Sequence, residues 1–273
     1  MAEIKFSIKY TGGKADEHKL DLYDAGASIH GLAKALAIST HALITEGEVR
    51  SKGDSIPNVK FYLHPPQKGS FVELVSVFFE NTAVQVVGAS VITAAFWDMI
   101  AYTWKSAVGK EYQPKERIPK EISTKNELFT QEIANVLERP LQQLHRPILH
   151  NHDVKIEIRR PRIGKIIEFD NDTLNYVYSK NEVGIQENIS GNVTKYNILS
   201  GYGRFYDDEE GRTIPFNLSN DLSVRMKELL TWSLHNTVRD NNGKILLDAE
   251  VISDNLDNIK RYIIVGVKNY VEN

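Results

Sequence analysis

Apolar and polar residues alternate along several short stretches of the chain. The segment EIKFSIKY, close to the start, places Ile4, Phe6 and Ile8 on one side and charged or polar residues on the other. This alternation is typical of a strand with one buried face. Similar stretches recur over most of the second half and also stand at residues 58–64, 70–79 and 154–160. The pattern predicts sheet in both halves of the chain.

Apolar residues at spacings of three, four and seven predict helices between these strands. The clearest stripe covers residues 22–44, and Asp24 is expected to be the N-cap of that helix. Further helices are expected at residues 83–104, 126–144 and 221–238. Pro140 should kink or split the second of these, because proline has no N–H to donate. The irregular succession of strands and helices predicts an α+β fold.

A charged segment with two prolines, KEYQPKERIPKEISTK, fills residues 110–125. Such a composition predicts a solvated linker. The expected organisation is therefore a small sheet with packed helices over residues 1–112, a linker and kinked helix over 113–150, and a β-rich domain over 151–273.

Composition narrows the classes of function. The formal net charge of −3 and the pI near 6.3 argue against a protein that binds nucleic acid over its whole surface. The chain has no cysteine, which excludes disulfides, thiolate zinc sites and cysteine nucleophiles. Its first residues lack the apolar core of an export signal, and a cytoplasmic location is expected.

One apolar segment is about long enough to span a membrane. Residues 83–101 carry a single charge, Asp98, and a spanning helix needs about 20 residues. Several polar residues dilute the segment, so a core or interface helix is favoured and membrane contact is not expected. Trp97, Ile100 and Trp104 are the residues expected to form a self-association surface, which predicts a homo-oligomer.

The segment HRPILHNHD holds the densest set of metal-capable side chains, namely His145, His150, His152 and Asp153. A transition metal needs three or four such ligands converging on one point. If they converge, the chain is a metal-dependent hydrolase or nuclease. A polar turn between a helix and a strand is the favoured interpretation, and no cofactor is expected.

A basic run, IRRPRIGK, follows this segment and contains Arg159, Arg160, Arg162 and Lys165. Arginine binds phosphate through its planar, forked guanidinium group. Charged side chains also protect the edge strands of sheets from unwanted pairing. Both interpretations stay open, with the edge strand slightly favoured.

Residues 191–219 resemble the first half of a cold-shock domain, a five-stranded barrel of the oligonucleotide-binding type. The matching positions are Gly191, Val193, Tyr196, Asn197, Gly201, Tyr202, Gly203 and Phe205. The resemblance covers about a tenth of the chain. It implies a small C-terminal β-barrel, with the helix at residues 223–237 as an insertion or a plug that closes the barrel end, and a surface that stacks the bases of single strands on aromatic rings.

The sequence departs from the cold-shock pattern at the positions that would touch a base. Lys195 and Arg204 replace stacking aromatic residues, and Pro215 and Asn217 replace a later phenylalanine and histidine. Tyr202 remains. The residues expected to bind a ligand or nucleic acid are Tyr202, Arg204, Lys195, Tyr196, Arg159, Arg160 and Arg162.

The predicted function is that of a non-enzymatic binding or scaffold protein. The chain has no phosphate-binding glycine loop and no nucleophile elbow. A protein or small-molecule partner is favoured over a single-stranded nucleic acid, which is expected to bind weakly at most. Outside the barrel segment the chain resembles hypothetical bacterial proteins, so a bacterial source is expected.

Overall fold

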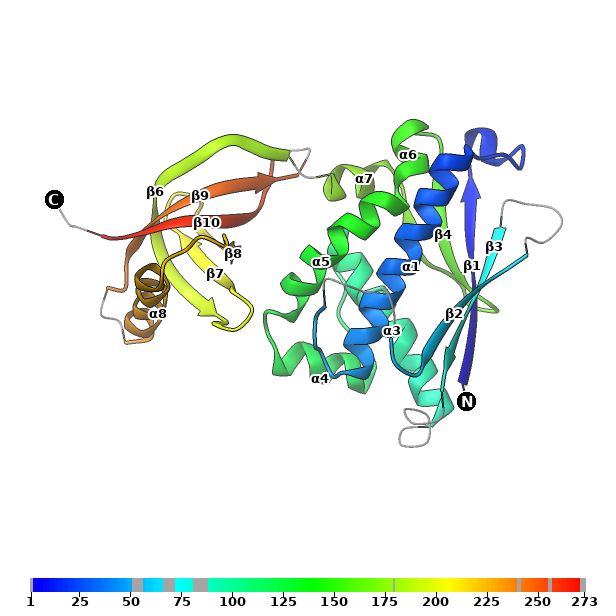
Figure 1. The fold of residues 1–273 in the computed structure, drawn as a ribbon, viewed down its shortest axis with the longest axis horizontal. Helices are drawn as coiled ribbons and strands as arrows, with labels where there is room; N and C mark the ends of the chain where they lie inside the picture. Colours follow the sequence, from blue (N-terminus) through cyan, green and yellow to red (C-terminus); the bar gives the residue numbers. More distant parts are fainter. Residues whose placement is uncertain are drawn as a thin grey trace. The chain divides into compact units, whose positions relative to one another are not determined.

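The chain folds into two compact units, Met1–Val177 and Tyr178–Asn273, in a computed structural model (Figure 1). We call them the N-terminal unit and the barrel unit. The structure describes residues 2–50, 56–65, 72–80, 88–178, 180–239, 242–254 and 257–270, without the side chains of residues 180–183.

The N-terminal unit combines a five-stranded antiparallel sheet with helices. Its first elements are β1 (Ala2–Thr11), the 3-10 turn η1 (Gly13–Ala15), α1 (Leu22–Ile44), β2 (Val59–His64), β3 (Val72–Phe79) and α3 (Ala89–Ala107). Then follow α4 (Arg117–Lys125), α5 (Phe129–Leu144), α6 (Arg146–His150), β4 (Lys155–Arg160), β5 (Gly164–Phe169) and α7 (Asn171–Val177). The strand order is β2-β3-β1-β4-β5.

The alternation in β1 creates one buried face of this sheet. Ile4, Phe6 and Ile8 are buried while Glu3 and Lys5 are exposed. Helices α1, α3 and α5 lie on one side of the sheet (Figure 1), and the ring of Phe6 meets that of Trp97 on α3 edge to face. The strand predicted at the start of the chain is therefore confirmed.

Helix α1 begins three residues earlier than an N-cap at Asp24 would place it. The carboxylate of Asp21 accepts hydrogen bonds from the backbone N–H groups of Tyr23 and Asp24, so Asp21 is the N-cap. Asp24 lies in the first turn with its side chain buried. The prediction of Asp24 as the cap was wrong because Asp21 already satisfies the free amides of that turn.

Helix α5 is continuous through Pro140, so the expected split does not occur. Its neighbour α1 approaches closely at Gly31. A Cβ at Gly31 would collide with the carbonyl oxygen of Pro140 and would lie 2.6 Å from the amide nitrogen of Leu144. The absence of a side chain at this position therefore allows the two helices to pack.

The predicted linker is part of the N-terminal unit. It contains α4 and is tied to buried Asp98 on α3, whose carboxylate accepts from the Tyr112 hydroxyl and from the amides of Lys115 and Glu116 at 2.7 Å each. Strand β4 pairs with β1, so residues 151–177 also belong to this unit. The boundary expected near residue 113 was wrong, because strand pairing across more than a hundred residues leaves no local signal.

The long apolar helix is a core element. Trp97, Ile100 and Trp104 of α3 are at most 4% exposed, and the Trp104 indole N–H donates to Ser39 Oγ. The self-association surface predicted from these residues is therefore wrong, because their own unit already covers them. In the part of the chain that the structure describes, no helix is long and apolar enough to cross a membrane. Residues 83–87 of the predicted helix lie outside the described residues.

The barrel unit is a closed five-stranded barrel with one inserted helix. Its elements are β6 (Lys180–Tyr196), β7 (Tyr202–Asp207), β8 (Arg212–Leu218), α8 (Val224–Val238), β9 (Ile245–Ser253) and β10 (Ile259–Asn269). The strands close in the order β10-β8-β7-β6-β9, in which only β8 and β10 pair in parallel. This topology is compatible with an oligonucleotide-binding-type barrel, and the predicted fold class is confirmed.

Two glycines of the cold-shock frame allow close approaches within the barrel. A Cβ at Gly191 would collide with the carbonyl oxygen of Tyr206, and one at Gly203 would collide with the ring of Phe216. Helix α8 covers the interior with buried Leu230. The two glycines are needed for packing within the barrel. This explains why the glycines of the cold-shock pattern are present although most of its stacking aromatic residues are replaced.

Candidate functional site

The outer surface of β7 carries the candidate ligand-binding residues. Alternation places Gly203, Phe205 and Asp207 inside the barrel and leaves Tyr202, Arg204 and Tyr206 on the outside. Tyr206 is 41% exposed, and the other two are half-buried. We call this set, with Lys195 of β6, the β7 face.

Strand register places a cationic row between the two tyrosines. Arg204 pairs with Lys195 on one side and with Pro215 on the other. Register shifts by one residue between Val193 and Lys195, so β6 has a bulge at Thr194, which brings the lysine opposite the arginine. The β7 face therefore presents two positive side chains level with each other.

Tyr196 does not belong to this surface. It pairs with inward-facing Gly203 and packs against the barrel core, with its ring 6.0 Å from that of Phe216. Burial raises the pKa of its hydroxyl. Its prediction as a binding residue was wrong, because the extra residue in the bulge reverses the alternation of side chains at the end of β6 and turns Tyr196 toward the inside of the barrel.

Tyr206 is a residue of the β7 face that the sequence analysis missed. It was overlooked because the positions that match the cold-shock domain end at Phe205, one residue earlier. The signal was nonetheless present, since Tyr202 and Tyr206 are four residues apart in an alternating strand and must share a side.

An apolar loop tip borders Tyr202. In the β6–β7 connection, Ile198 is 68% and Leu199 is 97% exposed. The loop is fixed locally, because the Asn197 side chain accepts from the amides of Leu199 and Ser200. The tip therefore adds two exposed apolar side chains next to Tyr202 in the chain.

A hollow of about 420 Å³ lies at the other end of the β7 face, beside Tyr206. Its remaining lining residues are Asn192, Thr194, Thr237, Asn242 and Gly243. The lining is polar and carries no formal charge. A ligand on Tyr206 would therefore find amide and hydroxyl partners next to the ring.

Carboxylates near the β7 face are engaged in the fold. Buried Asp207 accepts from the Tyr262 hydroxyl at 2.7 Å and from the amides of Glu209 and Glu210. Burial, and the hydrogen bond to the Asp207 carboxylate, raise the pKa of Tyr262. Asp208 forms an ion pair with Lys244 at 2.8 Å. These bonds fix the β7–β8 turn.

The histidine cluster does not form a metal site. His145 is fully buried, with Nδ1 donating to the Leu141 carbonyl and Nε2 lying 3.0 Å from the Thr173 hydroxyl. Burial lowers its pKa to about 4. His152 contacts Asn171 instead. Within the described ranges no three metal-capable side chains converge, so the alternative interpretation, a metal site that included Asp153, was wrong.

His150 binds Asp24 instead. The buried Asp24 carboxylate lies 2.8 Å from His150 Nδ1 and 2.9 Å from Arg146 Nε. The guanidinium group of Arg146 also covers the ring of Tyr23. The carboxylate thus ties α1 to α6 beside a hollow of about 250 Å³.

The arginine run belongs to the N-terminal unit. Arg159 and Arg160 belong to β4, which is flanked by β1 and β5, and Arg162 stands in the β4–β5 turn. The edge-strand interpretation was wrong for the arginines, because β5 takes the edge position. Lys165 lies on that edge strand.

Family comparisons follow the same division of the chain. A model for a domain of unknown function, DUF7946, matches residues 6–178. The chain belongs to the DUF7946 family. A second model, for the DUF7947 family of unknown function, matches residues 186–268. No curated protein and no solved structure matches this DUF7946 protein. Neither matching model is a cold-shock family, so the resemblance in the barrel unit extends to the closed barrel and no further.

Proposed function

We propose that this DUF7946 protein is a non-enzymatic binding protein whose barrel unit binds single-stranded nucleic acid through the β7 face. The observation that carries the proposal is the placement of Tyr202 and Tyr206 on either side of Arg204 on one outer strand surface. Oligonucleotide-binding barrels bind their ligands on the face of their second and third strands, which are β7 and β8 here.

The chemistry of the β7 face suits a single strand. Every base has a π-face, so rings such as Tyr202 and Tyr206 stack bases with little sequence preference, at about 1–3 kcal/mol per base. Lys195 and Arg204 supply positive charge for phosphate groups. A duplex hides the faces of its bases, so this arrangement favours single strands.

The structure changes the preferred partner. The sequence identified only one stacking residue, Tyr202, and a protein or small molecule was therefore favoured over a nucleic acid. Tyr206 adds a second ring and a polar hollow beside it, and this supports the cold-shock-like role more strongly. A cytoplasmic location and a bacterial source stay predictions.

Fluorescence anisotropy with a labelled, mixed-sequence single strand tests the proposal. The full chain should bind saturably at low salt, and Tyr202→Ala/Tyr206→Ala should weaken binding at least about tenfold. Tyr270→Ala is the matched control, since Tyr270 is a similarly exposed tyrosine of the same unit (38%). Equal affinities of the double variant and the wild type would refute the proposal and favour a protein or small-molecule partner.

A further inference from the structure

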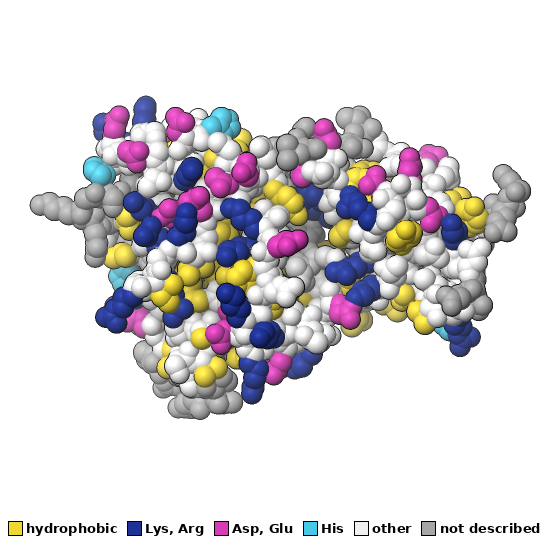
Figure 2. Space-filling model, turned by 180° about the vertical axis from the view of Figure 1, so that it is seen from behind, with side chains coloured by type: hydrophobic (Ala, Val, Ile, Leu, Met, Phe, Trp, Pro, Cys, Tyr) yellow, Lys and Arg dark blue, Asp and Glu magenta, His cyan; other side chains and the backbone are white. Residues whose placement is uncertain are grey.

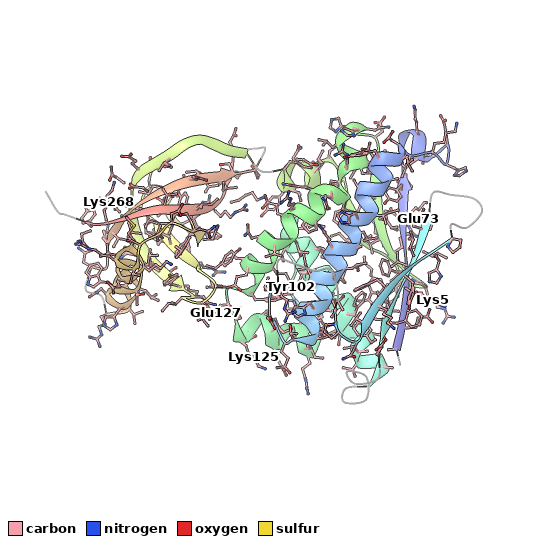
Figure 3. The ribbon with its side chains drawn as sticks, viewed as in Figure 1. Lys5, Glu73, Tyr102, Lys125, Glu127 and Lys268 are labelled. Atoms are coloured by element: carbon pink, nitrogen blue, oxygen red, sulfur yellow. The ribbon has the colours of Figure 1, made fainter. Side chains whose placement is uncertain are left out.

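The N-terminal unit has a cationic groove beside the β4–β5 hairpin. Two hollows of about 570 Å³ and 370 Å³ share Arg160 and Ile163 in their linings. Lys5 from β1 lines the first hollow, and Figure 3 shows it at the sheet of this unit. Lys105 of α3 lines the second. We call the two hollows together the hairpin groove.

Positive charge dominates the hairpin groove. The first hollow is lined by the cations Lys5, Arg159, Arg160 and Arg162, without a carboxylate. The second adds Lys105, Lys115 and Lys165, with the carboxylates Asp98 and Glu116. In Figure 2, which views the molecule from behind, Lys and Arg side chains gather over this unit. The concentration is local, because the whole chain has a net charge of −3.

Some of these cations are paired within the protein. Arg159 contacts Glu157 at 2.5 Å, and Lys165 contacts Glu168 at 2.5 Å. Among the described residues Asp98 forms no ion pair with the others, because its two oxygens accept from the Tyr112 hydroxyl and two backbone amides, and the two carboxylates of the lining are outnumbered by its seven cations. The lining therefore keeps an excess of positive charge.

Four cations of the groove have no ion pair in the described part of the chain, namely Arg160, Arg162, Lys105 and Lys115. Neutral rings hold three of them instead. Arg160 lies over Trp97 at 5.6 Å, and Lys105 and Lys115 lie over Tyr112 at 4.6 and 5.9 Å. A ring orients a cation and leaves its charge in place.

The cations also repel one another. Burial, followed by the charges of Lys115 and Lys110, lowers the pKa of Lys105. Arg162 takes a φ of 65° in the turn, a conformation that is uncommon for residues other than glycine, asparagine and aspartate. An anion in the groove would relieve the repulsion among these side chains.

We propose that the hairpin groove binds a chain of phosphate groups, with Arg160 at its centre and with Arg162, Lys105 and Lys115 as further ligands of the phosphates. Two hollows that share Arg160 and Ile163 and carry cations in both linings fit an extended polyanion better than a single ion. The rings of Trp97 and Tyr112 are already covered by cations, so no base stacks there. The groove therefore recognises charge alone, and binding there does not require the tyrosines of the β7 face.

Calorimetric titration of the full chain with inorganic tripolyphosphate tests this site, because the probe has no base. At low salt we expect saturable binding, weakened about tenfold by Arg160→Gln/Arg162→Gln and also by Lys105→Gln/Lys115→Gln. The two pairs lie on different elements, so a folding defect in one leaves the other informative. Lys120→Gln, at an exposed lysine of α4, is the matched control and should bind as the wild type does.

The source of the phosphates is resolved by competition. In the Tyr202→Ala/Tyr206→Ala background, a single-stranded oligonucleotide that displaces tripolyphosphate identifies a nucleic-acid backbone as the ligand. If the oligonucleotide does not displace tripolyphosphate, the ligand is a free oligophosphate. Both results are consistent with a phosphate-binding site in the hairpin groove. No saturable binding up to about 1 mM, or equal binding by the wild type and both groove variants, would overturn the proposal.

Discussion

Tyr202 and Tyr206 stand on the same outer side of β7 with Arg204 between them. At about 3.3 Å per residue, their backbones are about 13 Å apart along the strand. Lys195 is the register partner of Arg204, so positive charge lies between the two rings. A single-stranded nucleic acid that lies along β7 would contact a tyrosine ring, a pair of cations and a second tyrosine ring in succession.

Salt should separate the roles of the rings and the cations. Tyr202→Ala should weaken single-strand binding more than Lys195→Ala at high salt, because only stacking resists screening. Lys195→Ala and Arg204→Ala should instead reduce the slope of log affinity against log salt concentration, by about one for each phosphate that is no longer bound. Anisotropy titrations at several salt concentrations measure both quantities. Unchanged slopes in both cation variants would contradict this assignment.

Buried His145 should destabilise the N-terminal unit in mild acid. Its folded-state pKa is about 4, against 6.5 for an unperturbed histidine. Between these values the unfolded chain takes up a proton that the folded chain does not. The free energy of unfolding therefore falls as the pH falls from 6.5 to 4, by up to about 3 kcal/mol.

Urea unfolding at pH 7 and pH 5 measures this effect. His145→Gln cannot take up the proton, so its stability should fall less between the two pH values than that of the wild type, whatever the substitution costs at pH 7. His235→Gln, at an exposed histidine of the barrel unit, is the control and should behave as the wild type does. An equal fall in wild type and His145→Gln would show that other groups cause the acid sensitivity.

Much of the barrel could be predicted because its signals are local. Glycines such as Gly191 and Gly203 mark close backbone approaches, and alternation in the strands marks the inside. The bulge at Thr194 could not be predicted, and it decided that Tyr196 points inward. Tyr206 was within reach of the alternation rule but outside the resemblance.

The N-terminal unit was harder to predict because its decisive contacts are distant in sequence. Ile8 of β1 pairs with Ile158 of β4. Because of this pairing, the N-terminal unit extends to Val177, well beyond the boundary predicted near residue 113. Asp24 was mistaken for a cap because its true partners, Arg146 and His150, lie about 120 residues away. The histidines of residues 145–152 do not converge, because α5 ends just before this segment, α6 ends within it, and each histidine contacts a different partner.

Gly31→Ala should destabilise the packing of α1 against α5. The added methyl group would collide with the backbone of Pro140 and Leu144, which cannot rotate away. We expect the free energy of unfolding to fall by about 1–3 kcal/mol. Gly26→Ala is the control on the same helix, since its added Cβ would meet no atom within 4 Å beyond the neighbouring backbone of α1. A neutral Gly31→Ala would mean that the helices are less closely packed.

Asp24→Ala should destabilise the N-terminal unit by about 1–3 kcal/mol in urea unfolding. The substitution removes the buried acceptor of Arg146 and His150, although both partners retain access to water. Asp172→Ala, at an exposed aspartate of α7, should change stability by less than about 0.5 kcal/mol. Equal effects of the two substitutions would show that the contacts of Asp24 with Arg146 and His150 contribute nothing.

The most direct test of the β7 face compares a normal single strand with an abasic strand of the same length. Both carry the same phosphates, so the difference in their affinities isolates stacking. The wild type should prefer the normal strand by about 1–3 kcal/mol per stacked base, and Tyr202→Ala/Tyr206→Ala should lose that preference while its salt dependence remains. Equal affinity of the wild type for the two strands would contradict the proposal that the tyrosines bind bases.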